Sequence, residues 1–240
     1  MAFLFSILPM KYFDLHPWNL QYDEATKIQR ELSSRVMIQP FDTKPKLIAG
    51  ADVSYSKGSD IFFSSVVVFE MPDMNVVEES TAQDRVDFPY IPGLLSFRES
   101  PVLLKAFDKL KNVPDVVILD GQGIAHPRGL GIASHIGLIL DLPTIGCAKK
   151  VLVGKYEMPK IEAGDHSPLV YKEKTVGVAL RTKTNVLPVF ISPGHRMDVS
   201  SAIEIILSAC RGYKLPEPTR QAHLLVNRVR MSAGNMRKVN

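Results

Sequence analysis

Acidic side chains in and after predicted strands are the residues of this chain best suited to chemistry. Asp120 ends the apolar run Val116–Leu119 and precedes the glycine-rich stretch Gly121-Gln122-Gly123. Asp52 lies inside a second strand-like stretch, 47–55, where a carboxylate is unfavourable by strand propensity and by burial. A bound cation compensates for buried carboxylates, and open α/β folds build their sites at the carboxyl ends of strands. The two acids therefore predict a carboxylate metal site.

A third acid, Glu99, has local explanations of its own. Ser96 and Glu99 have the spacing of a capping box, and Ser100-Pro101 has the pattern of an N-cap followed by a first helical residue. Both patterns place Glu99 at the start of a helix, near the carboxyl edge of the sheet. Taken alone, Glu99 is better explained by helix capping than by catalysis.

Two basic residues each have a structural and a functional interpretation. Lys149 follows the apolar run Thr144–Ala148, where a lysine is usually exposed, or else its ammonium faces the metal site and stabilises a leaving oxygen. His223 follows Arg220 by three residues on one face of a predicted helix. This pair either supports packing or faces a phosphate or metal, and a lone helical histidine is more often structural.

The segment Pro89–Pro92 forms a loop bounded by prolines. Proline fixes its own φ and restricts the residue before it, so this loop is stiff. With Tyr90 and Ile91 at its tip, the loop suits a wedge that parts stacked bases. The alternative is a proline-rich turn that packs Tyr90 onto the core.

The glycines after Asp120 do not form a known nucleotide-binding motif. Gly121-Gln122-Gly123 lacks the third glycine of the dinucleotide fingerprint, and no phosphate-binding loop of the G-x-x-x-x-G-K-[ST] type occurs in the chain. The stretch still offers backbone N–H groups before a helix N-terminus, which suit a phosphate or a base edge. His126 and Arg128 follow and either cap this loop or solvate it.

The elements that position these residues alternate in a regular way. Helical patterns cover 23–35, 101–111, 132–140, 199–210 and 219–231, and strand patterns cover 47–55, 61–70, 75–82, 116–120, 144–147, 175–181 and 186–192. Three antiparallel strands followed by alternating helices and strands predict an α/β fold with a central mixed β-sheet flanked by helices. Residues 1–240 show no break in composition, so we expect a single domain in which 1–9 is a dispensable extension and 155–174 an insertion or a long surface loop.

Composition narrows the class of protein further. The net charge of +4 and the pI near 9.0 permit nucleic-acid binding without demanding it. Cys147 and Cys210 match no zinc spacing and indicate a reducing compartment. No segment has the pattern of a signal peptide or a transmembrane helix, so we expect a cytoplasmic protein with no membrane partner.

Taken together, these motifs resemble those of the endonuclease V family. They occur in the family's order from about residue 20 to residue 231, as Gly50–Ser54, Pro89–Gly93, Phe97–Glu99, Asp120–Gly123, His126–Arg128, Ala133–His135, Ala148–Lys150 and Arg220–His223. Each piece is weak, but the combination is highly specific. The resemblance implies a ribonuclease H-like fold. It also implies metal-dependent cleavage of strands containing inosine, at the second phosphodiester bond 3′ to the deaminated adenine, to initiate DNA repair.

The resemblance also implies individual roles. Asp52 and Asp120 match the metal-binding aspartates, Glu99 the third acid, and Lys149 and His223 the supporting basic residues. The strand-separating wedge corresponds to Pro89, Tyr90, Ile91 and Pro92, and the lesion pocket to Gly93, Leu95, Gly121, Gln122 and Gly123. The implied cofactor is Mg²⁺, with Mn²⁺ as an alternative. The implied partner of what we expect to be a monomer is deoxyinosine-containing DNA or inosine-containing RNA.

Three other functions use part of the same pattern. A ribonuclease H or resolvase-type nuclease acting on hybrid or branched substrates would share the acids but would not need Pro89–Pro92 or Gly121–Gly123. A ribonuclease specific for inosine in RNA is a further alternative. A non-catalytic nucleic-acid-binding module would need no cluster of acids.

Overall fold

The computed structural model describes residues 10 and 12–236, so the predicted extension 1–9 lies outside the described part of the chain. The helices are α1 (Tyr22–Ser33), α2 (Leu95–Phe107), α3 (Ile132–Leu140), α4 (Val199–Ser208) and α5 (Glu217–Met236). The strands are β1 (Leu47–Tyr55), β2 (Ile61–Glu70), β3 (Asn75–Arg85), β4 (Val116–Leu119), β5 (Thr144–Ala148), β6 (His166–Tyr171), β7 (Lys174–Leu180) and β8 (Val189–Pro193). No helix in these residues is both long and apolar enough to cross a membrane.

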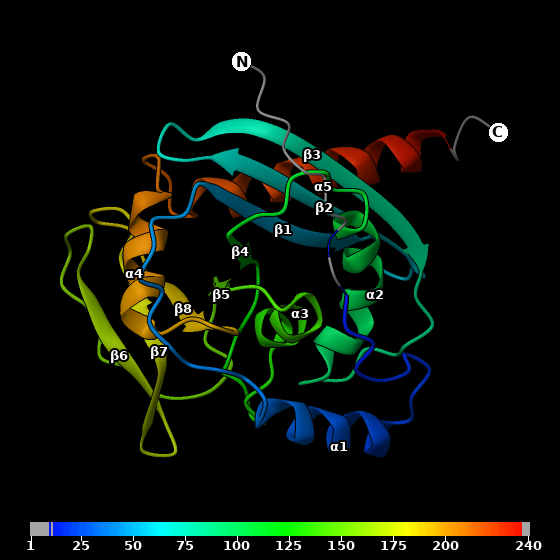
Figure 1. The fold of residues 1–240 in the computed structure, drawn as a ribbon, viewed down its shortest axis with the longest axis horizontal. Coiled ribbons are helices and arrows are strands. Elements are labelled where there is room, and N and C mark those ends of the chain that lie inside the picture. The colour runs from blue at the N-terminus through cyan, green and yellow to red at the C-terminus, as the bar shows by residue number, and fades with distance from the viewer. Residues whose placement is uncertain (1–9, 11, 237–240) are drawn as a thin grey trace.

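All of these strands join one mixed sheet in the order β3-β2-β1-β4-β5-β8-β7-β6 (Figure 1). β1 pairs with β2 antiparallel and with β4 parallel, and β4 pairs with β5 parallel. The strands on the far side, β5-β8-β7-β6, pair antiparallel. Since β1, β4 and β5 run in the same direction, their carboxyl ends meet at one edge of the sheet.

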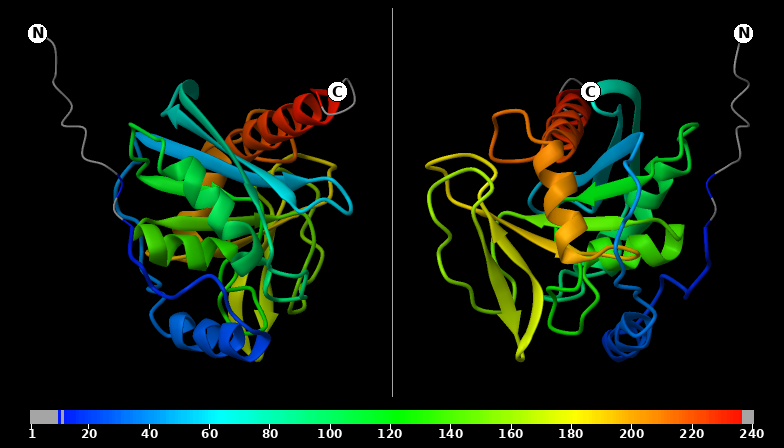
Figure 2. Two further views of the ribbon diagram at one scale, coloured as in Figure 1. Left: turned by 90° about the vertical axis from the view of Figure 1, so that its right-hand side faces the viewer. Right: turned by 60° about the vertical axis from the view of Figure 1, so that its left-hand side comes forward.

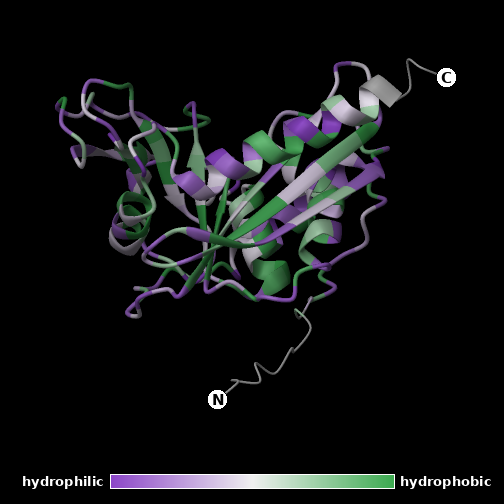
Figure 3. Ribbon diagram, turned by 90° about the horizontal axis from the view of Figure 1, so that it is seen from above, coloured by the Kyte–Doolittle hydropathy of each residue, from purple (hydrophilic) through white to green (hydrophobic). Residues whose placement is uncertain are grey.

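Helices cover both faces of the sheet, as the sequence predicts. Side chains alternate between the faces along a strand. Ile48 of β1 belongs to the core cluster that includes α4 and α5, whereas Ala49 and Ala51 belong to the cluster that includes α2 and α3. α5 lies along β1 and β2 (Figure 2), and hydrophobic and hydrophilic residues alternate along it (Figure 3). That alternation fits a helix with one face on the sheet.

The helix that carries Glu99 begins earlier than the sequence predicts. α2 begins at Leu95 rather than at residue 101, and its N-cap, Leu94, makes no side-chain capping hydrogen bond. Both capping interpretations of Glu99 are therefore wrong. Pro101 lies inside the helix, where it removes one backbone hydrogen bond. Complete burial of the Leu94 and Phe97 side chains outweighs this local cost and extends the helix toward its N-terminus.

The stretch 155–174 is not the uninterrupted loop that the sequence predicts, because it contains β6. This edge strand pairs antiparallel with β7, and the turn between them has positive φ at Lys172 (50°) and Glu173 (63°). Both angles suit the tight turn of a two-residue hairpin. Pro168 lies within β6, which is tolerated at a sheet edge because only one side of the strand must donate hydrogen bonds.

Candidate active site

Two aspartates lie side by side where β1 and β4 approach the carboxyl edge of the sheet. In the parallel pair, Ala51 lies opposite Leu119, so the next residues, Asp52 and Asp120, are neighbours. The Asp120 backbone N–H donates to the Ala51 carbonyl oxygen at 3.2 Å. The Asp52 side chain is buried, whereas Asp120 is partly exposed at the end of its strand.

A histidine of α5 completes this group from the face of the sheet that α5 covers. His223 Nδ1 lies 2.7 Å from Asp52 Oδ2. The approach is possible because Gly50 lies against the start of α5, where an added Cβ would lie 2.0 Å from the Pro218 carbonyl carbon. Asp52, Asp120 and His223 each offer one ligand atom, and these atoms lie within 4.8 Å of one another. Arg220 does not share this contact, because it pairs with Glu217 at 2.6 Å instead.

Burial and mutual repulsion raise the pKa values of two of the carboxyl groups, those of Asp52 and Glu99. Burial and then the charge of Asp120 raise the pKa of Asp52 to about 6, although hydrogen bonds from His223 and the Val53 N–H oppose the rise. Glu99 is buried on α2, and burial followed by the charges of Asp52 and Asp120 raises its pKa to about 8. Buried carboxylates that lie this close together indicate a functional site in which a cation balances their negative charges.

Lys149 supplies one positive charge at the same edge. It follows β5, and its Nζ lies 2.5 Å from Asp120 Oδ2. Burial by itself lowers the pKa of Lys149, but the hydrogen bond and charge of Asp120 outweigh burial and raise it. Lys149 is exposed, as is usual after a strand, and its ammonium also contacts Asp120. We call Asp52, Glu99, Asp120, Lys149 and His223 the acid edge.

The acid edge has the donors that a divalent cation requires. Carboxylate oxygens are the preferred ligands of Mg²⁺ and Mn²⁺, and an imidazole nitrogen also suits Mn²⁺. Three carboxylates face one ammonium here, so a divalent cation would reduce the repulsion that raises the pKa values of Asp52 and Glu99. The residues present therefore fit the metal site predicted from Asp52 and Asp120.

The proline loop, Pro89–Pro92, is largely exposed and shares a cavity lining with Gly121, the residue after Asp120. Tyr90 is 65% exposed, so the interpretation that packs it onto the core is wrong. The loop ends at Gly93, whose φ of 79° favours glycine. The Gly93 carbonyl oxygen accepts hydrogen bonds from Gln29 Nε2 (3.0 Å), His126 Nε2 (3.0 Å) and Arg128 Nη2 (2.8 Å). Three donors on one carbonyl fix the base of the loop.

His126 and Arg128 therefore do more than cap the glycine-rich loop, because they join it to the proline loop. Burial and then the charge of Arg128 lower the pKa of His126 to about 4. The ring is thus neutral at pH 7. With Nε2–H donating to Gly93, its Nδ1 accepts from the Arg128 backbone N–H at 3.2 Å.

A cavity of about 290 Å³ opens next to Tyr90, and we call it the glycine cavity. Its lining includes these residues of the predicted pocket and wedge: Tyr90, Ile91, Pro92, Gly93, Leu95, Gly121 and Gln122. Gly123 lies outside the lining, where its N–H donates to Ser192 Oγ at 2.8 Å and an added Cβ would lie 1.9 Å from the Pro193 carbonyl oxygen. Gly123 therefore allows close packing rather than contributing a wall.

Two supporting residues at these sites were not anticipated from the sequence. Asn227 Nδ2 lies 3.2 Å from His223 Nε2, one helical turn away on α5, and the i, i+4 spacing alone could have indicated this contact. Gln29 reaches Gly93 from α1, 64 residues away in the sequence, and no local pattern indicates that contact.

The chain has extensive similarity to one family of nucleases. A family model described as Endonuclease V matches residues 30–224. Endonuclease V of Methanothrix thermoacetophila is 50% identical over 224 residues, which cover 93% of this chain and 99% of that protein. The crystal structure of endonuclease V from Streptomyces avermitilis superposes with a TM-score of 0.87 at 39% identity, covering 95% of this chain and 100% of that one.

A more distant structural match contains nucleic acid. Endonuclease V of Ciona intestinalis, in complex with a 23mer DNA containing an inosine followed by a ribo-adenosine, superposes with a TM-score of 0.77 at 27% identity. The match covers 89% of this chain and 100% of that one.

Proposed function

The chain belongs to the endonuclease V family, and on this premise we propose that it cleaves inosine-containing DNA at the second phosphodiester bond 3′ to the inosine. Family membership makes the protein an endonuclease, that is, a hydrolase of phosphodiester bonds in DNA repair. Its mixed sheet with flanking helices is the ribonuclease H-like fold of these relatives.

The observation that carries the catalytic proposal is the convergence of Asp52, Asp120 and His223 within 4.8 Å beside buried Glu99. Asp52 and Asp120 would hold Mg²⁺, or Mn²⁺ as the alternative, with Glu99 acting directly or through a water. A divalent cation bound there neutralises phosphate charge, activates water and stabilises the leaving 3′ oxygen.

The basic residues of the acid edge act on the phosphate and on the aspartates. The Lys149 ammonium, fixed at 2.5 Å from Asp120, faces the position where negative charge develops and stabilises it. His223 holds Asp52 through Nδ1, while Asn227 contacts its other nitrogen. This pair of contacts orients the ring and, with it, the Asp52 carboxylate.

The proline loop and the glycine cavity read the lesion. Exposed Tyr90 enters the stack and parts the strands, and the extruded hypoxanthine enters the cavity beside it. Gly93 and Gly121 let backbone groups approach the edge of the base. Inosine pairs weakly, so extruding it costs less than extruding a normal base.

Cleavage of end-labelled duplexes tests this function. We expect a nick at the second phosphodiester bond 3′ to inosine that requires Mg²⁺ or Mn²⁺, and no nick in a duplex with adenine at the same position. Inosine-containing RNA and an RNA–DNA hybrid without inosine are run in parallel. Preferential cleavage of the hybrid would replace the proposal with a ribonuclease H-type activity, and preferential cleavage of the inosine-containing RNA would replace it with a ribonuclease activity.

We also propose that the chain acts as a monomeric single domain in the cytoplasm. Its described strands form one sheet, and Cys147 and Cys210 are free, as in a reducing compartment. Light scattering after size-exclusion chromatography, at several protein concentrations, tests the monomer.

A further inference from the structure

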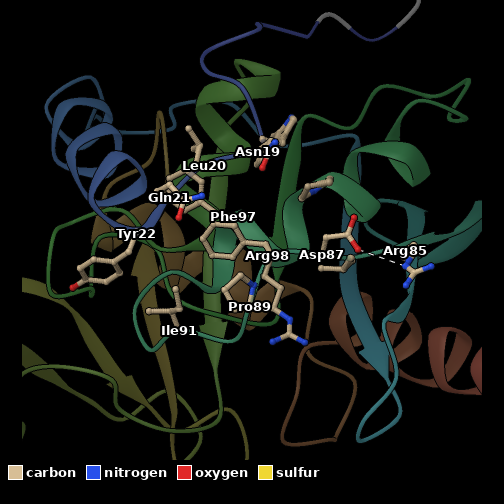
Figure 4. A pocket seen from close by; sticks show the side chains of 14 residues that line it. Asn19, Leu20, Gln21, Tyr22, Arg85, Asp87, Pro89, Ile91, Phe97 and Arg98 are labelled. Atoms are coloured by element: carbon tan, nitrogen blue, oxygen red, sulfur yellow. Dashed lines mark ion pairs between the residues drawn. The ribbon is translucent and has the colours of Figure 1, made fainter.

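A second, larger cavity lies on the other side of the proline loop, and no step of the proposed function uses it. It measures about 630 Å³, within the usual size range of ligand pockets, and we call it the aromatic cavity. Four aromatic rings line it: Trp18, Tyr22, Phe88 and Phe97. Figure 4 shows Phe97 and Arg98 near the middle of the lining, with Tyr22 and Gln21 on one side and the ion pair of Arg85 and Asp87 on the other.

Helix α2 separates the aromatic cavity from the acid edge. Successive helical residues are about 100° apart around the axis. Phe97 and Pro101 lie on one face, with Arg98 at its edge, and all three line the aromatic cavity. Leu95 and Glu99 lie on the opposite face, with Leu95 in the glycine cavity and Glu99 at the acid edge. The two cavities therefore lie on opposite sides of this helix.

The proline loop forms part of both walls. Ile91 lines the aromatic cavity and the glycine cavity, Pro89 lines only the former, and Tyr90 only the latter. A wedge at this position separates whatever enters the glycine cavity from whatever enters the aromatic cavity.

The walls of the aromatic cavity suit a flat, uncharged group. Arg85 is already paired with Asp60 at 2.9 Å and with Asp87 at 3.5 Å. The Arg98 guanidinium lies 4.9 Å from the centre of the Phe62 ring and 6.0 Å from that of Tyr90. Aromatic side chains stack on the face of a nucleobase, and a guanidinium beside them adds a cation–π contribution.

We propose that the aromatic cavity receives the base opposite the inosine, from the complementary strand, after the proline loop has parted the pair. This inference rests on the proposed function. The inosine strand must pass from the glycine cavity to the acid edge, and both lie on the Leu95–Glu99 face of α2. The strand displaced to the other face of α2 is then the complementary one. Stacking of its unpaired base on Phe88 and Trp18 offsets part of the cost of opening the duplex.

Trp18 is a built-in reporter, because it is the only tryptophan of the chain. Its fluorescence is titrated with three inosine-containing DNAs in the presence of a metal chelator, which prevents cleavage. The DNAs are a duplex with thymine opposite inosine, the same duplex with an abasic site opposite inosine, and the single strand. We expect quenching by the first and little or none by the other two at equal saturation.

A variant tests the same contact by affinity. Phe88→Leu removes one aromatic wall and keeps most of the apolar volume. It should weaken binding of the thymine-opposed duplex by about fivefold or more, while binding of the abasic-opposed duplex and of the single strand stays unchanged. Phe13→Leu, at a 48% exposed phenylalanine outside the cavity, is the matched control and should change none of the three.

The outcomes separate this inference from the proposed function. Inosine-dependent nicking with equal Trp18 quenching by the thymine-opposed and abasic-opposed duplexes would overturn the inference alone. An equal effect of Phe88→Leu on all three DNAs would do the same. Absence of any inosine-dependent binding or nicking would overturn the inference and the proposed function together. If Phe88→Leu does not fold, the Trp18 titration of the unaltered protein still decides.

Discussion

The acid edge and the proline loop differ in how the fold holds their side chains. At the acid edge, Asp52 is in a central strand and Glu99 in a buried helix, and His223 lies within 2.7 Å of Asp52. In the proline loop, the backbone is fixed at Gly93 by three hydrogen bonds, but Tyr90 at the tip is 65% exposed. Under the proposed function, the catalytic residues are thus built into the core, whereas the recognition residue is presented on a fixed base at the surface. Substitutions in the two regions should therefore have different effects on cleavage, DNA affinity and stability.

The largest effect is expected at the acid edge. Asp120→Asn should reduce nicking to about one thousandth or less, because it removes a charged metal ligand while keeping the volume. The free energy of unfolding should hardly change, since the relieved repulsion with Asp52 and Glu99 offsets the weakened ion pair with Lys149. Single-turnover cleavage and urea unfolding check the two parts. Cleavage close to that of the unaltered protein would remove Asp120 from the metal site.

At the tip of the proline loop, we expect the opposite pattern. Tyr90→Ala should weaken binding of inosine-containing DNA by about 5- to 150-fold, the range for losing one aromatic–base stack. The melting temperature should hardly change, because an exposed side chain leaves no cavity. Tyr213→Ala, at a 52% exposed tyrosine, is the control for losing an exposed ring. A large fall in melting temperature with unchanged affinity would end the wedge assignment.

His223 sharpens the comparison, because it is half-exposed yet belongs to the acid edge. His223→Ala should slow single-turnover cleavage by about 10- to 100-fold, the usual effect of losing a group that orients a metal ligand. The affinity for inosine-containing DNA should change much less. His166→Ala, at an exposed histidine on β6, should leave both unchanged. A loss of stability at an unchanged cleavage rate would make His223 a structural residue.

The strands and the acid pair were predictable from the sequence because their signals are local. β1, β2 and α3 have the predicted bounds, since apolar runs bounded by turn residues define them. Asp52 and Asp120 could be placed together because both are tied to strands of that sheet. The roles of Lys149 and His223, by contrast, came from the family resemblance.

Three features could not be predicted from the sequence, because each depends on tertiary contacts. The position of Glu99 within α2 follows from burial of Phe97, which overrides the local signal of Pro101. β6 was missed because Pro168 and its polar neighbours hide an edge strand whose inward side chains are only Ser167 and Leu169. The aromatic cavity joins residues 18–22 to 85–101, and no periodicity links segments so far apart.

The smallest expected effect concerns the N-terminal segment that borders the aromatic cavity. His16 Nε2 lies 2.7 Å from His135 Nε2 on α3, and His16 Nδ1 lies 2.8 Å from the Pro17 carbonyl oxygen. His16 Nδ1 must donate to that carbonyl, so in the neutral pair His135 Nε2–H donates to His16. His135 Nδ1 then carries no hydrogen, and it is buried with no hydrogen-bond partner among the described residues. Protonating it would bury an unpaired cation.

Stability should therefore fall on acidification. Burial and then the proximity of His16 lower the pKa of His135 to about 3, whereas in the unfolded chain it stays near 6.5. Between pH 6.5 and pH 3, His135 is protonated in the unfolded chain but stays neutral in the folded protein. The stabilisation that comes from the neutral His135 is therefore complete above pH 6.5 and is lost as the pH falls toward 3. From this one group, the free energy of unfolding should fall by about 2 kcal/mol between pH 7 and pH 5. In His135→Gln, urea unfolding should show a pH slope that is shallower by about 1 kcal/mol per unit, averaged over this window, whatever the variant's stability at pH 7. An unchanged slope would mean that the folded protein accepts a proton at this pair.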